Sequence, residues 1–183
     1  SDSNIYKQLF LETRQQLLEE KNELKKQIEI LLTKVGNTTY INNSTQNIQL
    51  NSYGNEDLSH ITESFKTNLL KGPFGMIPKM IEAVHFNHDK PENQNISYPN
   101  KKENKIKIFT EGKWVYKNKT DAISDLVDGK YFILDTHYES VCDELNENNK
   151  KVYESFRYNY DENDKILLET LKSQCELTLL NNR

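Results

Sequence analysis

The chain has 183 residues, of which 35% are hydrophobic and 28% are charged, and its 28 acidic and 24 basic residues give a formal net charge of -4. This balance excludes a strongly basic nucleic-acid binder, and no apolar run reaches the ~20 residues that cross a membrane. The length allows one or two domains around a modest core. We therefore expect an intracellular protein without a membrane segment. Because Ser1 leads directly into a helical pattern, we also expect the chain to be part of a longer protein.

Residues 4–35 are expected to form a long helix, because they are rich in Glu, Lys and Gln and carry an apolar repeat of seven residues. The predicted seam consists of Phe10, Leu17, Leu24, Ile28, Leu31 and Val35. Such a seam favours a coiled coil in which the protein associates with itself. Packing of the same stripe against the rest of its own chain is the alternative.

Residues 36–52 form an asparagine-rich connector after Gly36, a residue typical of helix ends. Ile48 and Leu50 alternate with polar residues, which predicts a short strand near residues 48–53. This strand has too few apolar side chains to fold alone, so it would pair with another edge, including one in a second subunit. A flexible linker is the alternative for the first half of the connector.

Residues 53–183 are expected to form an α+β domain that is mainly α. The spacing predicts a helix over 56–70 capped by Asp57 or Ser59, and a short helix that opens at Pro78. Alternation in 105–117 around Gly112 predicts an antiparallel β-hairpin. A helix over about 120–127 and C-terminal helices, broken near 146–149 and 161–164, complete the domain.

His85, Asn87 and His88 lie within four positions, directly after the predicted short helix. A base histidine, an orienting asparagine and a metal-holding side chain are the parts of an HNH-like nuclease, so His85 is the candidate centre of such a site. The order of elements differs from that of such nucleases, in which a hairpin precedes the helix. The alternative is structural, with these side chains bonded to the backbone of an irregular loop. No metal-ligand spacing and no cofactor motif is evident, so we expect neither a metal ion nor a cofactor.

Four lysines and several aromatic residues lie close together in and before the predicted hairpin. The lysines are Lys101, Lys102, Lys105 and Lys107, and the aromatic residues are Tyr98, Trp114 and Tyr116. Direct binding of nucleic acid is one interpretation, because lysines contact phosphates and aromatic rings stack on bases. Lysines also protect exposed sheet edges from strand addition, which is the other interpretation.

Five segments of the chain together resemble a large family of giant-virus, mimivirus-like proteins. They are Ile48–Asp57, Gly72–Pro78, Val84–Asn87, Lys90–Ile96 and Gly112–Trp114. In that family the similar region usually follows an N-terminal zinc finger with two cysteine and two histidine ligands and a coiled coil. The resemblance extends from about Glu19 to the last predicted helix.

The resemblance implies that this chain is the C-terminal, oligomerising region of a nucleic-acid-binding viral protein. It also implies a location in the host cytoplasm, the viral factory or the virion. The cysteines and histidines of the zinc finger are absent here, so nucleic-acid binding through a finger would belong to a missing N-terminal segment. The expected partners are thus the chain itself and, mainly through that segment, nucleic acid. The resemblance assigns no activity to the C-terminal region.

Overall fold

The computed structural model describes the backbone of residues 2–35 and 48–183, and the side chains of residues 11–28 and 48–183. The described residues form six α-helices and one three-stranded antiparallel sheet, which confirms a mainly α, α+β fold. The chain divides into two compact units, Ser1–Gln46 and Asn47–Arg183.

The first unit contains one continuous helix, α1 (Asp2–Val35), which confirms the predicted helix. The side chains of Leu17, Leu24 and Ile28 are exposed, with 59%, 58% and 55% of their surfaces accessible. Phe10, Leu31 and Val35 are the other members of the predicted seam, and their side chains lie outside the described residues. The predicted connector falls mostly outside them as well.

The second unit begins with an irregular segment and a shorter first helix than predicted. Helix α2 (Glu63–Leu70) starts after Thr62, whose hydroxyl accepts a hydrogen bond from the Phe65 amide at 3.1 Å. The predicted start at residue 56 is wrong because Asp57 accepts the Ser59 amide at 2.9 Å in a tight local turn. Neither predicted cap residue therefore caps α2.

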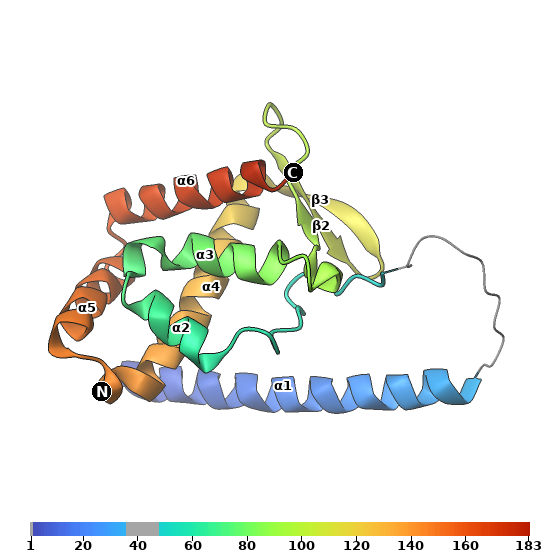
Figure 1. Ribbon diagram of the computed structural model, residues 1–183, viewed down its shortest axis with the longest axis horizontal. Helices are drawn as coiled ribbons and strands as arrows, with labels where there is room; N and C mark the ends of the chain where they lie inside the picture. The colour runs from blue at the N-terminus through green and yellow to red at the C-terminus, as the bar shows by residue number, and fades with distance from the viewer. Residues whose placement is uncertain (1, 36–47) are drawn as a thin grey trace. The chain divides into compact units, whose positions relative to one another are not determined.

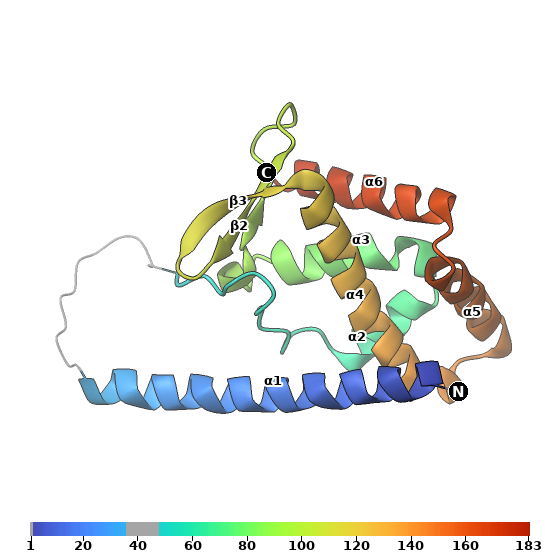
Figure 2. The same cartoon turned by 180° about the vertical axis from the view of Figure 1, so that it is seen from behind.

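Helix α3 (Pro73–His85) is the centre of the globular unit. It starts at Pro73, so the predicted start at Pro78 is wrong, and Pro78 lies inside the helix. Its core-facing residues, all with no exposed surface, are Met76, Ile77, Met80, Ile81 and Val84. This helix contacts α2 and three later helices, α4 (Lys119–Val141), α5 (Glu147–Asp161) and α6 (Lys165–Asn181). It runs between α2 and α6, and α4 crosses it (Figures 1 and 2).

The hairpin prediction is confirmed by β2 (Lys105–Thr110) and β3 (Lys113–Asn118). They are joined by Glu111 and Gly112, whose φ angles of 51° and 76° are typical of a type I′ turn. A third strand, β1 (Ile96–Ser97), was not predicted and pairs with β2, so the strand order is β1-β2-β3. The sheet lies near the C-terminal ends of α3 and α6 (Figure 1).

The strand predicted near residues 48–53 does not form. Instead, the Asn51 amide donates to the Glu92 carbonyl at 2.7 Å and the Tyr53 amide donates to the Phe109 carbonyl at 2.6 Å. Both amides are thus bonded to other parts of the globular unit. It is an irregular segment attached to the globular unit.

The C-terminal half is helical, as predicted, with one difference. Helix α4 continues to Val141 and passes through Gly129, although the sequence predicted an end near residue 127. The predicted breaks are confirmed, because Asn146 caps α5 and Asp164 caps α6. Two short 3₁₀ helices, η1 (Pro91–Asn93) and η2 (Cys142–Glu144), complete the order of elements. In the described part of the chain no helix is both long and apolar enough to cross a membrane.

Candidate functional site

His85 lies in the last turn of α3 and is fully buried. Its Nδ1 lies 2.9 Å from Oδ1 of Asn95, and the ring stacks on Tyr53 with 6.0 Å between ring centroids. The amide nitrogen of Asn95 donates to the Asn51 carbonyl at 3.1 Å and to Glu56 Oε1 at 2.8 Å. Because the nitrogen of Asn95 faces two acceptors, its oxygen accepts from His85, and Nδ1 of His85 carries the proton.

Asn93, also fully buried, makes a second set of bonds to the same irregular segment. Its Oδ1 accepts from the Asn51 side chain at 3.0 Å and from the Asp57 amide at 2.9 Å. Its Nδ2 donates to the Asp57 carbonyl at 2.7 Å. We call Glu56, His85, Asn93 and Asn95 the buried polar network. It supplies partners for backbone groups that a regular strand would otherwise pair, as the structural interpretation of this loop expects.

The electrostatics of the network favour a neutral histidine beside a charged carboxylate. Burial lowers the pKa of His85, and the nearby positive charge of Lys130 lowers it further. Burial alone would raise the pKa of Glu56, but His85, Lys130 and hydrogen bonds from Asn95 and the Gly54 amide hold it below its usual value. Because His85 is neutral at pH 7, Lys130 and the two hydrogen bonds stabilise the Glu56 carboxylate there. The Nε2 atom of His85 is buried without a hydrogen-bond partner among the described residues.

The other members of the predicted nuclease centre do not join His85. His88 is exposed, and Asn87 Oδ1 accepts the Asp89 amide at 2.9 Å. Within residues 11–28 and 48–183, no three His, Cys, Asp or Glu side chains are placed to hold a metal ion together. A nuclease base must reach substrate and lie near a cation, so the described geometry offers no support for the nuclease interpretation.

The outward face of the sheet carries aromatic and basic side chains together. Five residues define what we call the sheet platform: Lys105, Lys107, Phe109, Trp114 and Tyr116. In the strand register Lys107 pairs with Tyr116 and Phe109 pairs with Trp114, so these side chains share one face. The opposite face of β2 is buried in the core through Ile106 and Ile108.

The platform side chains contact one another. Lys107 Nζ lies 5.1 Å from the centroid of the Tyr116 ring, and Lys105 Nζ lies 6.0 Å from it. Phe109 and Trp114 meet edge to face with centroids 5.7 Å apart. Trp114 and Tyr116 remain 42% and 57% exposed. The face is therefore an ordered surface of rings and ammonium groups that solvent can reach.

The structure divides the predicted lysine strip into two parts. Lys105 and Lys107 belong to β2 and to the platform, whereas Lys101 and Lys102 are exposed in the loop before it. This loop is held by Tyr98, whose hydroxyl donates to the carbonyls of Lys101 at 3.2 Å and Glu103 at 3.3 Å. Lys101 and Lys102 thus lie beside the sheet and not on it.

One pocket of about 280 Å³ lies between α4 and α6. Lys119 at its edge already binds Glu176, with 3.0 Å between Nζ and Oε1. The remaining lining residues are Thr120, Ile123, Glu169, Lys172 and Ser173. The lining residues carry charges of both signs, and Lys119 and Glu176 already form an ion pair with each other. The pocket therefore indicates no particular ligand.

Three residues in or beside the sheet platform and the buried polar network were not predicted from the sequence. Phe109 could have been found, because the alternation that predicts the hairpin places it on the same face as Lys105 and Lys107. Glu56 and Lys130 could not, because both are far from His85 in the chain. Lys130 approaches it through the packing of α4 on α3, and Glu56 through the irregular segment that Asn95 binds.

Comparisons with family models, with curated proteins and with solved structures give no match for this chain.

Proposed function

We propose that this chain is a self-association module, in which the seam of α1 pairs with the same seam in other copies. The exposure of Leu17, Leu24 and Ile28 carries the proposal. Three aliphatic side chains of one helical stripe are each more than half exposed. Burying one such side chain contributes about 1.5–3 kcal/mol, so three from each of two chains give on the order of 10 kcal/mol before the costs of association.

A second copy fits this stripe because the spacing of seven residues is the repeat that two supercoiled helices share. The helix has 34 residues and forms a unit separate from the globular one. Its other faces carry Glu, Lys and Gln, which keep a paired helix soluble. The resemblance to zinc-finger proteins of giant viruses supports the same proposal, with the module bringing several nucleic-acid-binding segments together inside an infected cell or a virion.

Light scattering after size-exclusion chromatography at micromolar concentration tests the proposal. The unmodified chain should give a mass that is a multiple of the single-chain mass. The double variant Leu17→Lys/Leu24→Lys should give the single-chain mass, because two ammonium groups replace the centre of the seam. Its helical circular dichroism should also fall, since an unpaired helix is marginal in water.

Glu19→Lys is the matched control, because it changes the net charge by the same two units at an exposed position away from the seam. This variant should keep the mass of the unmodified chain. A single-chain mass for the unmodified protein, or an equal effect of both variants, would overturn the proposal. The nuclease alternative predicts metal-dependent cutting that His85→Ala abolishes, and no feature of the described site favours it.

A further inference from the structure

We propose that the sheet platform binds single-stranded nucleic acid, with bases stacked on its aromatic rings and phosphates at its lysines. This activity is separate from self-association and uses residues of the globular unit alone. Its evidence is the composition of one sheet face. The paired positions there are Ser97, Lys105, Lys107, Phe109, Trp114, Tyr116 and Asn118, and none of them is acidic.

The aromatic residues supply stacking surfaces in consecutive rows of the sheet. Phe109 and Trp114 form one row, and Tyr116 lies in the next row beside Lys107. Rows on one face of a sheet are about 6.8 Å apart, because every second residue points the same way. The outer rings are 42% and 57% exposed, so a ligand in solution can reach both of them. Bases of any sequence can stack on such rings.

The lysines add charge of the sign that phosphates require. Lys105 and Lys107 both point their ammonium groups toward Tyr116, at 6.0 and 5.1 Å from its centroid. A base stacked on that ring would place its own phosphates near these ammonium groups. Lys101 and Lys102 in the adjoining loop extend the basic surface beyond the sheet.

Protection of a sheet edge does not account for Lys107. This residue is on the central strand β2 and has paired residues on both sides, Ser97 of β1 and Tyr116 of β3, whereas Lys105 lies beyond the two residues of β1 and is paired with β3 alone. Edge protection requires lysines on an outer strand, as Lys113 and Lys117 are on β3. Lys107 therefore needs another explanation, and binding of an anionic strand supplies one.

A single strand fits the platform better than a duplex. Ring faces can contact only bases that are unstacked, whereas a duplex offers its phosphates and the edges of its bases. We therefore expect binding without strong sequence preference.

Trp114 provides a direct measurement, because it is the only tryptophan of the chain and belongs to the platform. We expect its fluorescence to be quenched when an oligothymidylate of about 12 nucleotides is added to the full chain at low salt. Tyr116→Ala should weaken this binding by roughly fivefold to 100-fold, the usual loss for one stacked base. Tyr158→Ala is the control, since Tyr158 is 66% exposed on α5, and it should change nothing.

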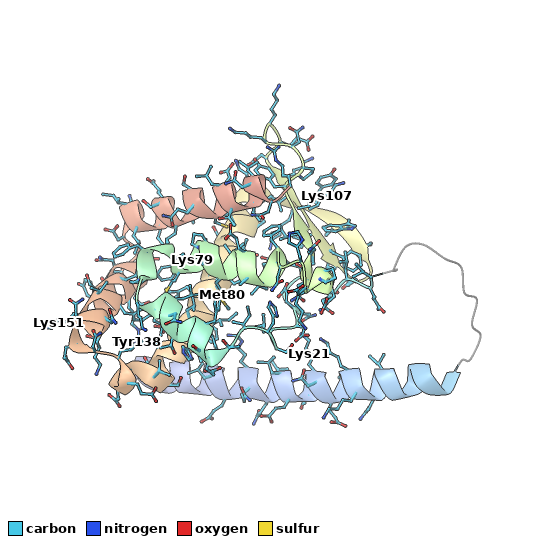
Figure 3. The ribbon with its side chains drawn as sticks, in the orientation of Figure 1. Lys21, Lys79, Met80, Lys107, Tyr138 and Lys151 are labelled. Atoms are coloured by element: carbon cyan, nitrogen blue, oxygen red, sulfur yellow. The ribbon has the colours of Figure 1, made fainter. Side chains whose placement is uncertain are left out.

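The contribution of charge is tested by Lys105→Gln/Lys107→Gln. This variant should bind more weakly and should reduce the slope of log affinity against log salt by about 1.4, or 0.7 for each lost phosphate contact. Lys79→Gln/Lys151→Gln removes the same charge from exposed positions on α3 and α5 and should leave affinity and slope unchanged. Figure 3 labels Lys79, Lys107 and Lys151, and the two control residues lie on helices away from the hairpin.

Two further ligands separate stacking from simple charge attraction. An abasic oligonucleotide of equal length and a blunt DNA duplex should both bind more weakly than the oligothymidylate. The expected loss of affinity is about tenfold or more, which corresponds to the loss of one to two stacked bases. Equal binding of the abasic strand, stronger binding of the duplex, or unquenched Trp114 at micromolar protein would each overturn the proposal. Leu17→Lys/Leu24→Lys should bind the short strand as well as its control Glu19→Lys does, which separates this test from the test of self-association.

Discussion

His85 shows how a residue that looks catalytic can be structural. Its Nδ1 is committed to Asn95, and its ring is stacked on Tyr53 beneath the surface. Burial and Lys130 lower its pKa, so the imidazole stays neutral in the folded protein. In the unfolded chain the same group takes up a proton near its ordinary pKa of about 6.5.

This difference predicts a stability that falls in mild acid. Because the folded pKa of His85 is lowered, its stabilising contribution is present above pH ~6.5 and is lost as the pH falls below that value, by about 1.4 kcal/mol per pH unit. Urea unfolding between about pH 6.5 and 5 should therefore lose about 2 kcal/mol from this residue. Glu56, whose pKa is also lowered, titrates below that window.

The control for this prediction is His88→Gln, which changes an exposed histidine and should leave the slope unchanged. His85→Gln should reduce the slope by about one proton. His137 contributes in the same direction, because burial lowers its pKa despite Glu63 at 2.9 Å, so a smaller slope should remain. An identical slope in His85→Gln and the unmodified chain would contradict the assignment.

Asn95 is the residue on which the buried polar network depends most. Asn95→Ala removes the partners of His85 Nδ1 and of the Asn51 carbonyl, and one partner of Glu56. Because several buried polar groups are left unpaired, we expect the free energy of unfolding to fall by about 2–4 kcal/mol. Asn148→Ala, at an exposed position in α5, should stay within about 0.5 kcal/mol of the unmodified chain in the same urea titration. A similar small change for Asn95→Ala would mean that water replaces the amide.

At the scale of elements, the contribution of backbone conformation to stability can be measured at the turn between β2 and β3 without a change in side-chain packing. Gly112 has φ +76°, and a Cβ placed there would meet nothing within 4 Å. Gly112→Ala should therefore cost about 1 kcal/mol through backbone conformation alone. Gly129 in α4 has equally open surroundings but no positive φ, so Gly129→Ala should stabilise the chain by about 0.5–1 kcal/mol. Urea unfolding of the two variants should give shifts of opposite sign, and shifts of the same sign would exclude this explanation.

Elements with a strong local pattern were predictable from the sequence. The alternation and the turn at Gly112 predicted the hairpin, and the heptads predicted α1. Errors arose where tertiary contacts override local signals. Pro78 is tolerated inside α3 because four other helices pack on that helix, and residues 48–52 are not a strand because Asn95 binds the Asn51 carbonyl and the Glu92 carbonyl binds the Asn51 amide instead. The two-residue strand β1 depends on its pairing with β2 and has no signal of its own.

The candidate sites were predictable to different degrees for the same reason. The lysines and Trp114 are close together in the sequence, so their proximity in space was predictable. That Trp114 shares a face with these lysines and with Phe109 required the strand register. The roles of His85 and Asn95 required knowledge of burial, which spacing along the chain does not give.

At the scale of the whole molecule, the two proposals make a joint prediction about long nucleic acids. If α1 joins several chains, one assembly carries several sheet platforms, and a strand long enough to reach two of them binds with higher avidity. A short strand occupies one platform and gains nothing. The ratio of affinities for oligothymidylates of about 60 and about 12 nucleotides should therefore depend on α1.

We expect this ratio to exceed roughly 100 for the unmodified chain and for Glu19→Lys. For Leu17→Lys/Leu24→Lys it should fall to about 5, the statistical factor for a strand with about five times as many places to bind. Fluorescence of Trp114 and light scattering on the same samples report binding and assembly separately. A ratio near 5 in an assembled chain would mean that one strand cannot reach two platforms of the assembly. A high ratio in the single-chain variant would place the second contact within one subunit.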